Sequence, residues 1–239
     1  MRNHSYSSED RDYLIELIRY FPVLVPPTIN QAQQKIQDRC QSWNPSEFVE
    51  KFIELFDSDT FVDILPSLPI ELHEMIFDGI LSNAGCYRDK SDAYTEGHVE
   101  FGLPVRRLSC EADSSNGKFT GVKPELIERE VEKAFKCLEK GPQDPLVNAA
   151  TFYQQFIRAH PFYDANGRIG RFIVDAYLYS HNMYIDWEKL KNTTRWIRQL
   201  NYCHRKIYVE EYNKRPYKKA LKYWIQYLRK FVHVVNEGE

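Results

Sequence analysis

The residues best suited to chemistry lie in one short stretch, residues 160–171, which reads HPFYDANGRIGR. His160 supplies a base, because a neutral imidazole can accept a proton from an attacking hydroxyl near pH 7. Arg168 and Arg171 stand three residues apart, so on a helix they share one face. Asp164 precedes them, and a lone carboxylate beside a polyphosphate commonly holds Mg²⁺ through one ligand and several waters. These residue types indicate attack of a hydroxyl on a phosphorus atom.

An apolar helix is predicted on each side of this stretch, so the chain can present it as a rigid loop. The first covers residues 147–159, and Pro161 and Phe162 should end it and fix the loop to the core. The second covers residues 166–181, with Asn166 as its N-cap. Its first turn offers unpaired N–H groups, the positive end of the helix dipole and two guanidinium groups, which together suit phosphate.

The rest of the chain is predicted to be mainly helical. Residues 1–85 are predicted to form helices interrupted by proline. One of these helices begins near Pro69 and ends near residues 83–85, and its apolar spacing places Leu72, Met75, Ile76 and Ile80 inward. Helical periodicity is lost between residues 86 and 121. Residues 99–108 and 118–122 look extended and are joined by turn residues, so a hairpin or irregular flap is expected at about 99–122.

From Pro124 the pattern is helical again, and residues 216–235 predict one long amphipathic helix. The expected organisation is therefore an N-terminal helical region at 1–85, packed on the core, followed by a second unit at 86–239. The sequence does not indicate a role for the first of these.

Composition excludes several classes of protein. The 239 residues carry a net charge of −2, so no global positive field favours nucleic acid or an anionic membrane. The five cysteines are odd in number and form no CxxC, which argues against a disulfide framework or a zinc ribbon. No stretch approaches the length of a membrane span, and no apolar signal run opens the chain. A cytoplasmic protein is expected, or an effector delivered into a host cytoplasm.

The stretch at 160–171 resembles the signature of the Fic family, HPFx(D/E)(G/A)NGRxxR, at every fixed position. A looser resemblance begins near Tyr87, where YRDK and the later GKFTGV and PELI are similar to the family's flap and following helix. Residues 1–85 contain no motif of the family. The resemblance implies a helical bundle with a short β-hairpin flap, and Mg²⁺-dependent transfer of AMP from ATP to a Ser, Thr or Tyr hydroxyl of a target protein.

The same resemblance implies a role for each motif residue. His160 would be the catalytic base and Asp164 the Mg²⁺ ligand, and the nucleotide-binding residues would be Asn166, Gly167, Arg168, Gly170 and Arg171. The flap would hold the target protein as an added strand, and residues 196–202 are where adenine contacts are expected. Self-modification and a homo-oligomer are both compatible with this picture, and no nucleic-acid partner is expected.

Other activities remain open. A phosphocholine-transferring branch of the family also reads DANGR, and UMP or GMP transfer and a non-catalytic nucleotide-sensing module are further alternatives. Gly167 argues against the kinase branch, which has Lys there. The inhibitory pattern (S/T)xxxE(G/N) is not matched at Ser67–Glu71, at Ser5–Glu9 or at Glu237–Gly238. We therefore expect no built-in inhibition, or restraint by a partner.

Four other polar residues were weighed for a role. Asp175, one turn beyond Arg171, should either orient that arginine or face solvent. His73, His181 and His204 lack metal-ligand spacing and are expected to be surface or satisfied core histidines.

Overall fold

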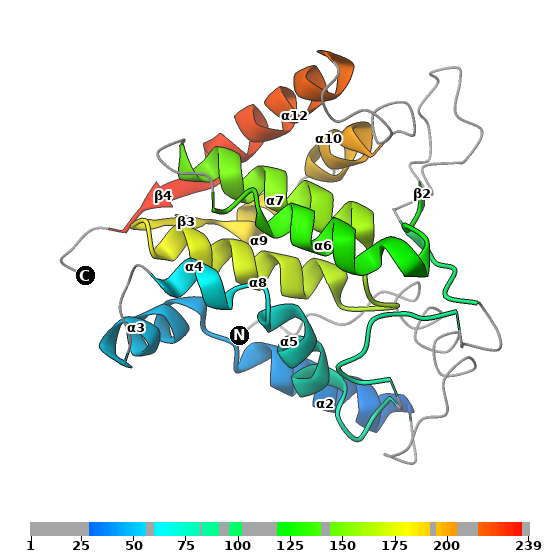
Figure 1. Ribbon diagram of the computed structural model, residues 1–239. Helices are drawn as coiled ribbons and strands as arrows, with labels where there is room; N and C mark the ends of the chain where they lie inside the picture. The colour runs from blue at the N-terminus through cyan, green and yellow to red at the C-terminus, as the bar shows by residue number, and fades with distance from the viewer. Residues whose placement is uncertain are drawn as a thin grey trace.

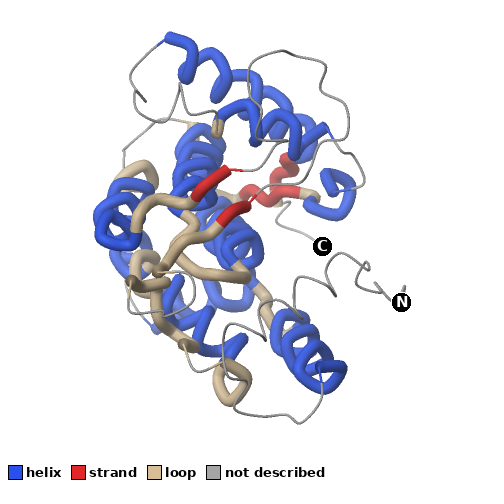
Figure 2. The backbone as a smooth tube through the Cα atoms, turned by 90° about the vertical axis from the view of Figure 1, so that its right-hand side faces the viewer, coloured by secondary structure: helices blue, strands red, loops and turns tan. Residues whose placement is uncertain are grey.

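The chain folds as a mainly helical protein with two short antiparallel strand pairs (Figure 1, Figure 2). The computed structural model describes residues 29–55, 60–81, 83–90, 96–101, 119–139, 144–191, 195–204 and 215–235. This confirms the predicted fold class. Within these ranges, no helix is both long and apolar enough to cross a membrane.

The centre of the fold is a pair of helices that lie side by side, α7 (Pro145–Ala159) and α8 (Asn166–Tyr179) (Figure 1). Helix α7 begins where Asp144 accepts a hydrogen bond from the backbone N–H of Leu146 at 3.0 Å, with Pro145 as the first helical residue. Helix α8 buries the apolar positions that recur every three or four residues, as the sequence predicts: Ile169, Phe172, Ile173, Ala176 and Tyr177.

Four N-terminal helices lie below α8 in Figure 1: α2 (Ile29–Gln41), α3 (Pro45–Leu55), α4 (Phe61–Ile64) and α5 (Leu68–Phe77). Aromatic rings join them to α8, because Phe172 lies 5.6 Å from Phe48 and 5.5 Å from Trp43 between ring centroids. Arg39 of α2 donates to the carbonyls of Ile76 and Asp78 at the end of α5. The described part of residues 1–85 therefore shares one hydrophobic core with the motif helix.

One prediction for α5 is wrong. The helix ends at Phe77 rather than at 83–85, and Met75 is 48% exposed instead of facing inward. Its sulfur instead accepts a hydrogen bond from the Trp43 indole at 3.1 Å. Beyond the helix end, Ile80 is still buried, because a turn rather than a further helical turn directs it to the core.

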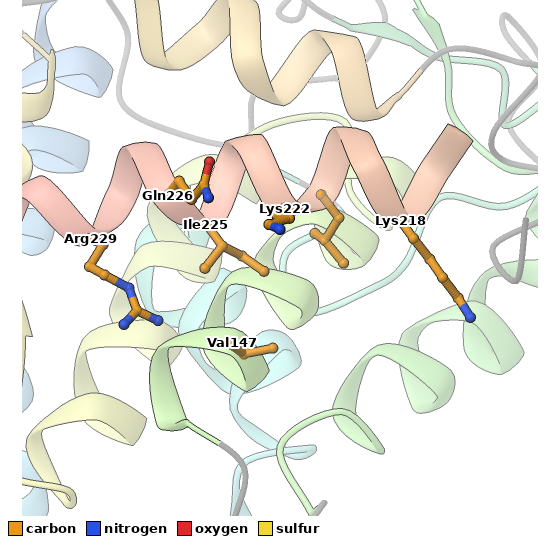
Figure 3. A pocket seen from close by; sticks show the side chains of 7 residues that line it. Val147, Lys218, Lys222, Ile225, Gln226 and Arg229 are labelled. Carbon is orange, nitrogen blue, oxygen red and sulfur yellow. The ribbon is translucent and has the colours of Figure 1, made fainter. Parts of the chain in front are cut away.

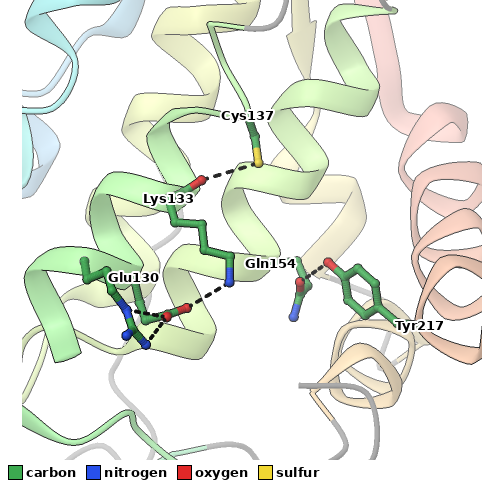
Figure 4. Close-up of polar contacts among 6 residues, drawn as sticks. Glu130, Lys133, Cys137, Gln154 and Tyr217 are labelled. Atoms are coloured by element: carbon green, nitrogen blue, oxygen red, sulfur yellow. Dashed lines mark hydrogen bonds and ion pairs between the residues drawn. The ribbon is translucent and has the colours of Figure 1, made fainter. Parts of the chain in front are cut away.

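Three further helices of the described residues complete this part of the fold. Helix α6 (Ile127–Phe135), which follows a 3-10 turn at Pro124–Leu126, and helix α12 (Arg215–Leu228) pack on α7, and helix α10 (Arg195–Cys203) packs on α12. A buried polar contact fixes α12 to α7, since the Tyr217 hydroxyl donates to Gln154 Oε1 at 2.6 Å (Figure 4). Gln154 Nε2 in turn lies 3.1 Å from Nδ1 of His204, so this interface is hydrogen-bonded as well as apolar.

The first strand pair occupies the predicted flap. Strand β1 (Glu100–Phe101) pairs antiparallel with β2 (Phe119–Thr120), with Glu100 opposite Thr120. Both strands fall within the two segments that the sequence predicts to be extended. The turn predicted between them, residues 113–117, lies outside the described residues.

The second strand pair corrects the predicted C-terminal helix. Helix α12 ends at Leu228, a 3-10 turn follows, and β4 (Val232–Val234) pairs antiparallel with β3 (Met183–Ile185). The short helix α9 (Trp187–Lys191) follows β3. The prediction of one helix to residue 235 was wrong because two β-branched valines here gain a strand partner from a segment about 50 residues earlier.

Candidate active site

His160 stands at the C-terminal end of α7 with a left-handed backbone, φ 50° and ψ 59°. Few side chains other than glycine adopt this conformation, and it turns the chain out of the helix directly at the imidazole. The ring Nδ1 lies 3.3 Å from the carbonyl oxygen of Ile157. Because a carbonyl can only accept, Nδ1 carries the proton, and Nε2 is left as the proton acceptor.

The His160 ring is kept neutral by its surroundings. It stacks on Phe101 of β1, with centroids 4.4 Å apart and planes 12° apart. Burial lowers the pKa of His160 to about 3, and the nearby guanidinium groups of Arg88 and Arg158 act in the same direction. The Ile157 carbonyl and Asp164 oppose them. The structure therefore presents a neutral imidazole beneath the flap strands.

The loop after His160 is held by the Asn166 side chain. Its Oδ1 accepts from the backbone N–H of Phe162 at 3.0 Å, and its Nδ2 donates to the Phe162 carbonyl at 2.8 Å. Phe162 itself is fully buried, stacked on His73 at 4.2 Å, as the predicted anchor of the loop. The N-cap prediction was wrong: Ala165 precedes α8 with φ 62°, and Asn166 is the first helical residue. The Asn166 side chain makes its two hydrogen bonds to the Phe162 backbone instead of capping a backbone N–H of α8.

The first turn of α8 brings Gly167 and Arg171 together. A Cβ on Gly167 would lie 3.3 Å from Nη1 of Arg171, so the guanidinium lies over the start of the helix. The first four N–H groups of any α-helix have no partner within the helix, and the positive end of the dipole is here. This turn therefore combines a guanidinium with backbone donors in the way that phosphate requires.

Neighbouring side chains fix the position of Arg171. Burial raises the pKa of the Tyr153 hydroxyl, whereas a hydrogen bond from Arg171 lowers it. The Arg171 guanidinium also lies 6.0 Å from the centre of the Trp187 ring. The Trp187 indole donates to both carboxylate oxygens of Asp175, at 2.6 and 2.8 Å. Asp175 thus contacts the tryptophan beside Arg171, an arrangement the sequence did not suggest.

Asp164 and Arg168 form an ion pair, with 2.9 Å between Oδ2 and Nη2. Oδ1 of Asp164 accepts from the Ala165 backbone N–H at 2.6 Å, and Nη1 of Arg168 lies 3.8 Å from the Cys40 sulfur. Both side chains stay partly exposed, at 18% for Asp164 and 25% for Arg168. The predicted metal ligand and a predicted phosphate ligand therefore compensate each other's charge in this structure.

Asp164 is the predicted metal ligand, and its surroundings bear on which cations it could suit. In the part of the chain that the structure describes, no group of three or more His, Cys, Asp or Glu side chains could enclose a metal ion. A single accessible carboxylate suits Mg²⁺, which keeps most of its waters and takes further oxygens from phosphate. It does not suit zinc, which is held by three or four protein ligands.

Gly170 faces α7 rather than the loop. A Cβ at this position would lie 3.1 Å from the Tyr153 ring and 3.2 Å from the Phe156 ring. The residue is buried, and its small size allows α7 and α8 to approach closely. Its contacts are thus those of helix packing, whereas the sequence reading grouped it with the nucleotide-binding residues.

Arg88 belongs to the site, and sequence reasoning missed it. The side chain is 3% exposed, and Nε donates to the carbonyl oxygen of His160 at 2.6 Å. The only signal in the sequence was its place in YRDK, next to Tyr87, whose ring lies 5.1 Å from Phe162. Nothing in the local pattern indicates a contact 72 residues along the chain.

Other residues weighed from the sequence have different surroundings. Helix α10 includes the segment expected to contact adenine, and Trp196 there lies 6.5 Å from the Trp224 ring. Of the inhibitory-pattern glutamates, Glu71 is exposed on α5, whereas Glu9 and Glu237 lie outside the described residues. His181 is at the surface and His73 is a buried histidine whose Nδ1 accepts from the Gly85 N–H at 3.1 Å, both as expected. The expectation is wrong in part for His204, which is buried and whose Nε2 has no hydrogen-bond partner among the described residues.

A pocket of about 490 Å³ lies between α12 and the start of α7 (Figure 3). Its floor includes Val147, Leu221 and Ile225, and Lys218 and Lys222 line it as well. Val147 is near the first turn of α7 and His160 at its end, which at 1.5 Å per residue places them about 20 Å apart. This pocket is therefore separate from the motif loop.

Comparisons with known proteins identify one family. A family model described as the Fic/DOC family matches residues 64–178. No curated protein matches the chain. A solved Fic family protein from Desulfovibrio desulfuricans G20 has 15% identity and a TM-score of 0.44, covering 96% of this chain and 76% of its own.

Two further solved structures are similar to the chain. One is a Fic domain containing signaling protein from Bacteroides thetaiotaomicron VPI-5482, with 16% identity, a TM-score of 0.46 and 93% of each chain covered. The other is the BepC protein, a VirB-translocated Bartonella effector, from Bartonella tribocorum with bound AMPPNP, with 18% identity, a TM-score of 0.43, and 84% of this chain and 88% of that chain covered. At these TM-scores the likeness adds nothing to the family match.

Proposed function

Residues 64–178 belong to the Fic/DOC family, and on this premise we propose that the chain transfers AMP from ATP to a hydroxyl side chain of a protein. Members of the family commonly transfer AMP or another nucleoside monophosphate to proteins. The observation that carries the proposal is the His160 imidazole at the end of α7, whose Nδ1 is engaged by the Ile157 carbonyl while Nε2 can accept a proton.

The reaction needs two things from the protein, a base and positive charge beside the phosphates. The target hydroxyl loses its proton to Nε2 of His160 as its oxygen bonds to the α-phosphorus of ATP. The bond between that phosphorus and the bridging oxygen breaks, and pyrophosphate leaves. Negative charge grows on the phosphate oxygens, and the N–H groups at the start of α8, together with Arg168 and Arg171, supply the compensating charge.

Asp164 is the residue that would hold Mg²⁺ in this proposal. When bound, the ion would neutralise phosphate charge and orient the oxygens of the triphosphate. Arg168 pairs with Asp164 at 2.9 Å in the structure. When nucleotide and cation enter together, Arg168 would exchange this carboxylate for a phosphate, and Asp164 would exchange the guanidinium for Mg²⁺. This exchange keeps every charge compensated before and after binding.

The flap strands are proposed to dock the target. The paired segments Glu100–Phe101 and Phe119–Thr120 lie directly beside His160, since Phe101 stacks on its ring. An extended target segment adding to a strand edge would bring its hydroxyl to the base, and backbone hydrogen bonds would supply the affinity.

Transfer of label from ATP tests the proposal. The protein is incubated with Mg²⁺ and ATP labelled at the α-phosphate, alone and with cell extract, beside His160→Ala and the surface control His181→Ala. Removing a general base costs about 10²–10⁴ in rate, so His160→Ala should lose labelling while His181→Ala keeps it.

Three outcomes would redirect the assignment. Equal labelling by wild type and His160→Ala would refute the role of the base. Labelling from CDP-choline in place of ATP would assign phosphocholine transfer to the same site. Binding of ATP without transfer of any group would favour the alternative that the protein is a non-catalytic nucleotide-sensing module.

A further inference from the structure

The end of α7 is held by one buried arginine. Arg88 donates from Nε to the carbonyl of His160 at 2.6 Å and from Nη2 to the carbonyl of Ala159 at 3.1 Å. These are carbonyls at a helix C-terminus, which have no partner within the helix and carry the negative end of its dipole. A guanidinium here stabilises the helix end and fixes the orientation of the peptide unit that follows His160.

The same guanidinium also binds the backbone on both sides of the flap strand pair. Nη1 donates to the carbonyl of Gly97, just before β1, and Nη2 donates to the carbonyl of Val122, just after β2. A backbone hydrogen bond also joins the flap to the end of α7, because the Val122 N–H donates to the Ala159 carbonyl at 3.3 Å. One side chain therefore spans three segments: the residues before β1, those after β2 and the end of α7.

The glycine at position 121 makes room for this arrangement. A Cβ there would lie 2.6 Å from Nη2 of Arg88 and 2.7 Å from a methyl carbon of Val99. A real Cβ does not approach other atoms so closely, so any larger residue at 121 would displace the guanidinium. The position of Arg88 thus depends on Gly121 as well as on its own hydrogen bonds.

Only arginine can make this set of contacts. Its planar group has donors on three nitrogens pointing in fixed directions, whereas lysine offers a single ammonium at one point. Burial lowers the pKa of Arg88 to about 10, so the group is still charged at neutral pH. A charged group in this position acts on the carbonyl dipoles of all four acceptors.

We propose that Arg88 is a positioning residue that sets the distance between the His160 base and a hydroxyl docked on the flap. This inference rests on the proposed transferase function and deepens it. A target that adds to β1 or β2 takes its position from the flap, and His160 takes its position from the end of α7. Arg88 joins the two, so its loss misaligns the base and the attacking oxygen while leaving the phosphate-binding turn of α8 intact.

The test uses four variants and two readouts. Arg88→Gln removes both the positive charge and the planar set of guanidinium donors, and Arg88→Lys keeps only the charge. Gly121→Ala leaves Arg88 unchanged but adds a methyl group that would displace its guanidinium. Arg39→Gln is the matched control, because Arg39 also donates to two backbone carbonyls, those of Ile76 and Asp78. The readouts are transfer of label from ATP as a function of ATP concentration, and the ¹⁵N NMR shifts of the His160 ring, assigned by their loss in His160→Ala.

Arg88→Gln should lower the transfer rate at saturating ATP by about 100-fold, the usual effect of a displacement of about 1 Å. The half-saturating ATP concentration should stay within about twofold, since α8 is untouched. The His160 ring shifts should move in Arg88→Gln and Gly121→Ala and stay in place in Arg39→Gln. Arg88→Lys should fall between wild type and Arg88→Gln.

Two results would overturn the inference. The first is a folded Arg88→Gln protein that keeps both its His160 shifts and its transfer rate. The second is an equal loss of rate in Arg39→Gln, which would reduce the effect to general stability. If Arg88→Gln does not fold, Arg88→Lys and Gly121→Ala decide by the same criteria. If the wild type transfers no group at all, the proposed function fails, and the ring shifts still report whether Arg88 positions His160.

Discussion

Mild acid should destabilise this protein far more than its net charge suggests, because the buried His73 and His204 and the half-buried His160 are neutral. Burial lowers the pKa of His160 to about 3 and that of His73 to about 4, and it lowers the pKa of His204 well below the usual value. In the unfolded chain each would titrate near the ordinary value of about 6.5. Below that pH the unfolded state binds more protons than the folded state, so the free energy of unfolding falls as pH falls.

The magnitude follows from proton counting. Each histidine that is charged only in the unfolded state removes about 1.4 kcal/mol per pH unit. Between pH 6 and pH 5 most unfolded histidine is protonated, so the three together should remove about 3–4 kcal/mol. Domains have a total stability of about 5–15 kcal/mol. The loss between pH 6 and pH 5 is therefore a large fraction of the total stability. It begins above the pH range in which carboxyl groups titrate and continues until the pH falls through the folded pKa values.

Urea unfolding at pH 7, 6 and 5 measures this loss directly. His73→Gln and His204→Gln should each reduce the loss by about a third, because the unfolded state of each variant binds one proton fewer. Replacing His181, which is exposed, should leave the loss unchanged. A loss below about 1 kcal/mol between pH 6 and pH 5 would mean that at least two of the three histidines are charged in the folded protein. If His160→Gln leaves the loss between pH 6 and pH 5 unchanged, the argument for a neutral His160 base is wrong.

Three further predictions concern the two central helices. Gly170→Ala should lower the free energy of unfolding by about 0–2 kcal/mol in urea titrations, because a methyl 3.1 Å from the Tyr153 ring adds strain that exceeds the gain of about 1 kcal/mol in helix propensity; a gain in stability would refute close packing there. Asn166→Ala should cost about 1–3 kcal/mol in the same assay, since two buried backbone groups lose their partner, and a neutral effect would contradict the bridging role. Trp187→Phe should raise the half-saturating ATP concentration about fivefold, equivalent to about 1 kcal/mol, because the hydrogen bonds to Asp175 that hold the ring beside Arg171 are lost; an unchanged value would separate this pair from nucleotide binding.

Much of the site could be predicted from local pattern. The apolar spacing on both sides of the motif predicts α7 and α8, and the structure places their limits within two residues of those expected at 159, 166 and 181. The burial of Phe162 also follows, because a large apolar residue after a helix end has few alternatives to the core. These features depend on neighbours in sequence, which is why they could be found.

Two of the failures have a common physical cause, which is contact between segments far apart in the sequence, and a third is a local contact within the motif loop. Val232–Val234 forms a strand only because Met183–Ile185 offers it an edge. Arg88 meets His160 across 72 residues, and neither position alone indicates the other. Asn166 satisfies the capping rule by type, yet its amide bonds the Phe162 backbone in both directions because the loop folds back on itself. Propensity cannot decide among partners that only the folded chain brings together.

The mass of the group added to a modified hydroxyl tests the central claim most directly. Wild type and His160→Ala are each incubated with ATP and Mg²⁺, and the modified peptides are identified by mass spectrometry. We predict one AMP on a Ser, Thr or Tyr side chain with wild type, and none with His160→Ala. The same adduct in both proteins, or an adduct other than AMP with wild type, would contradict the account.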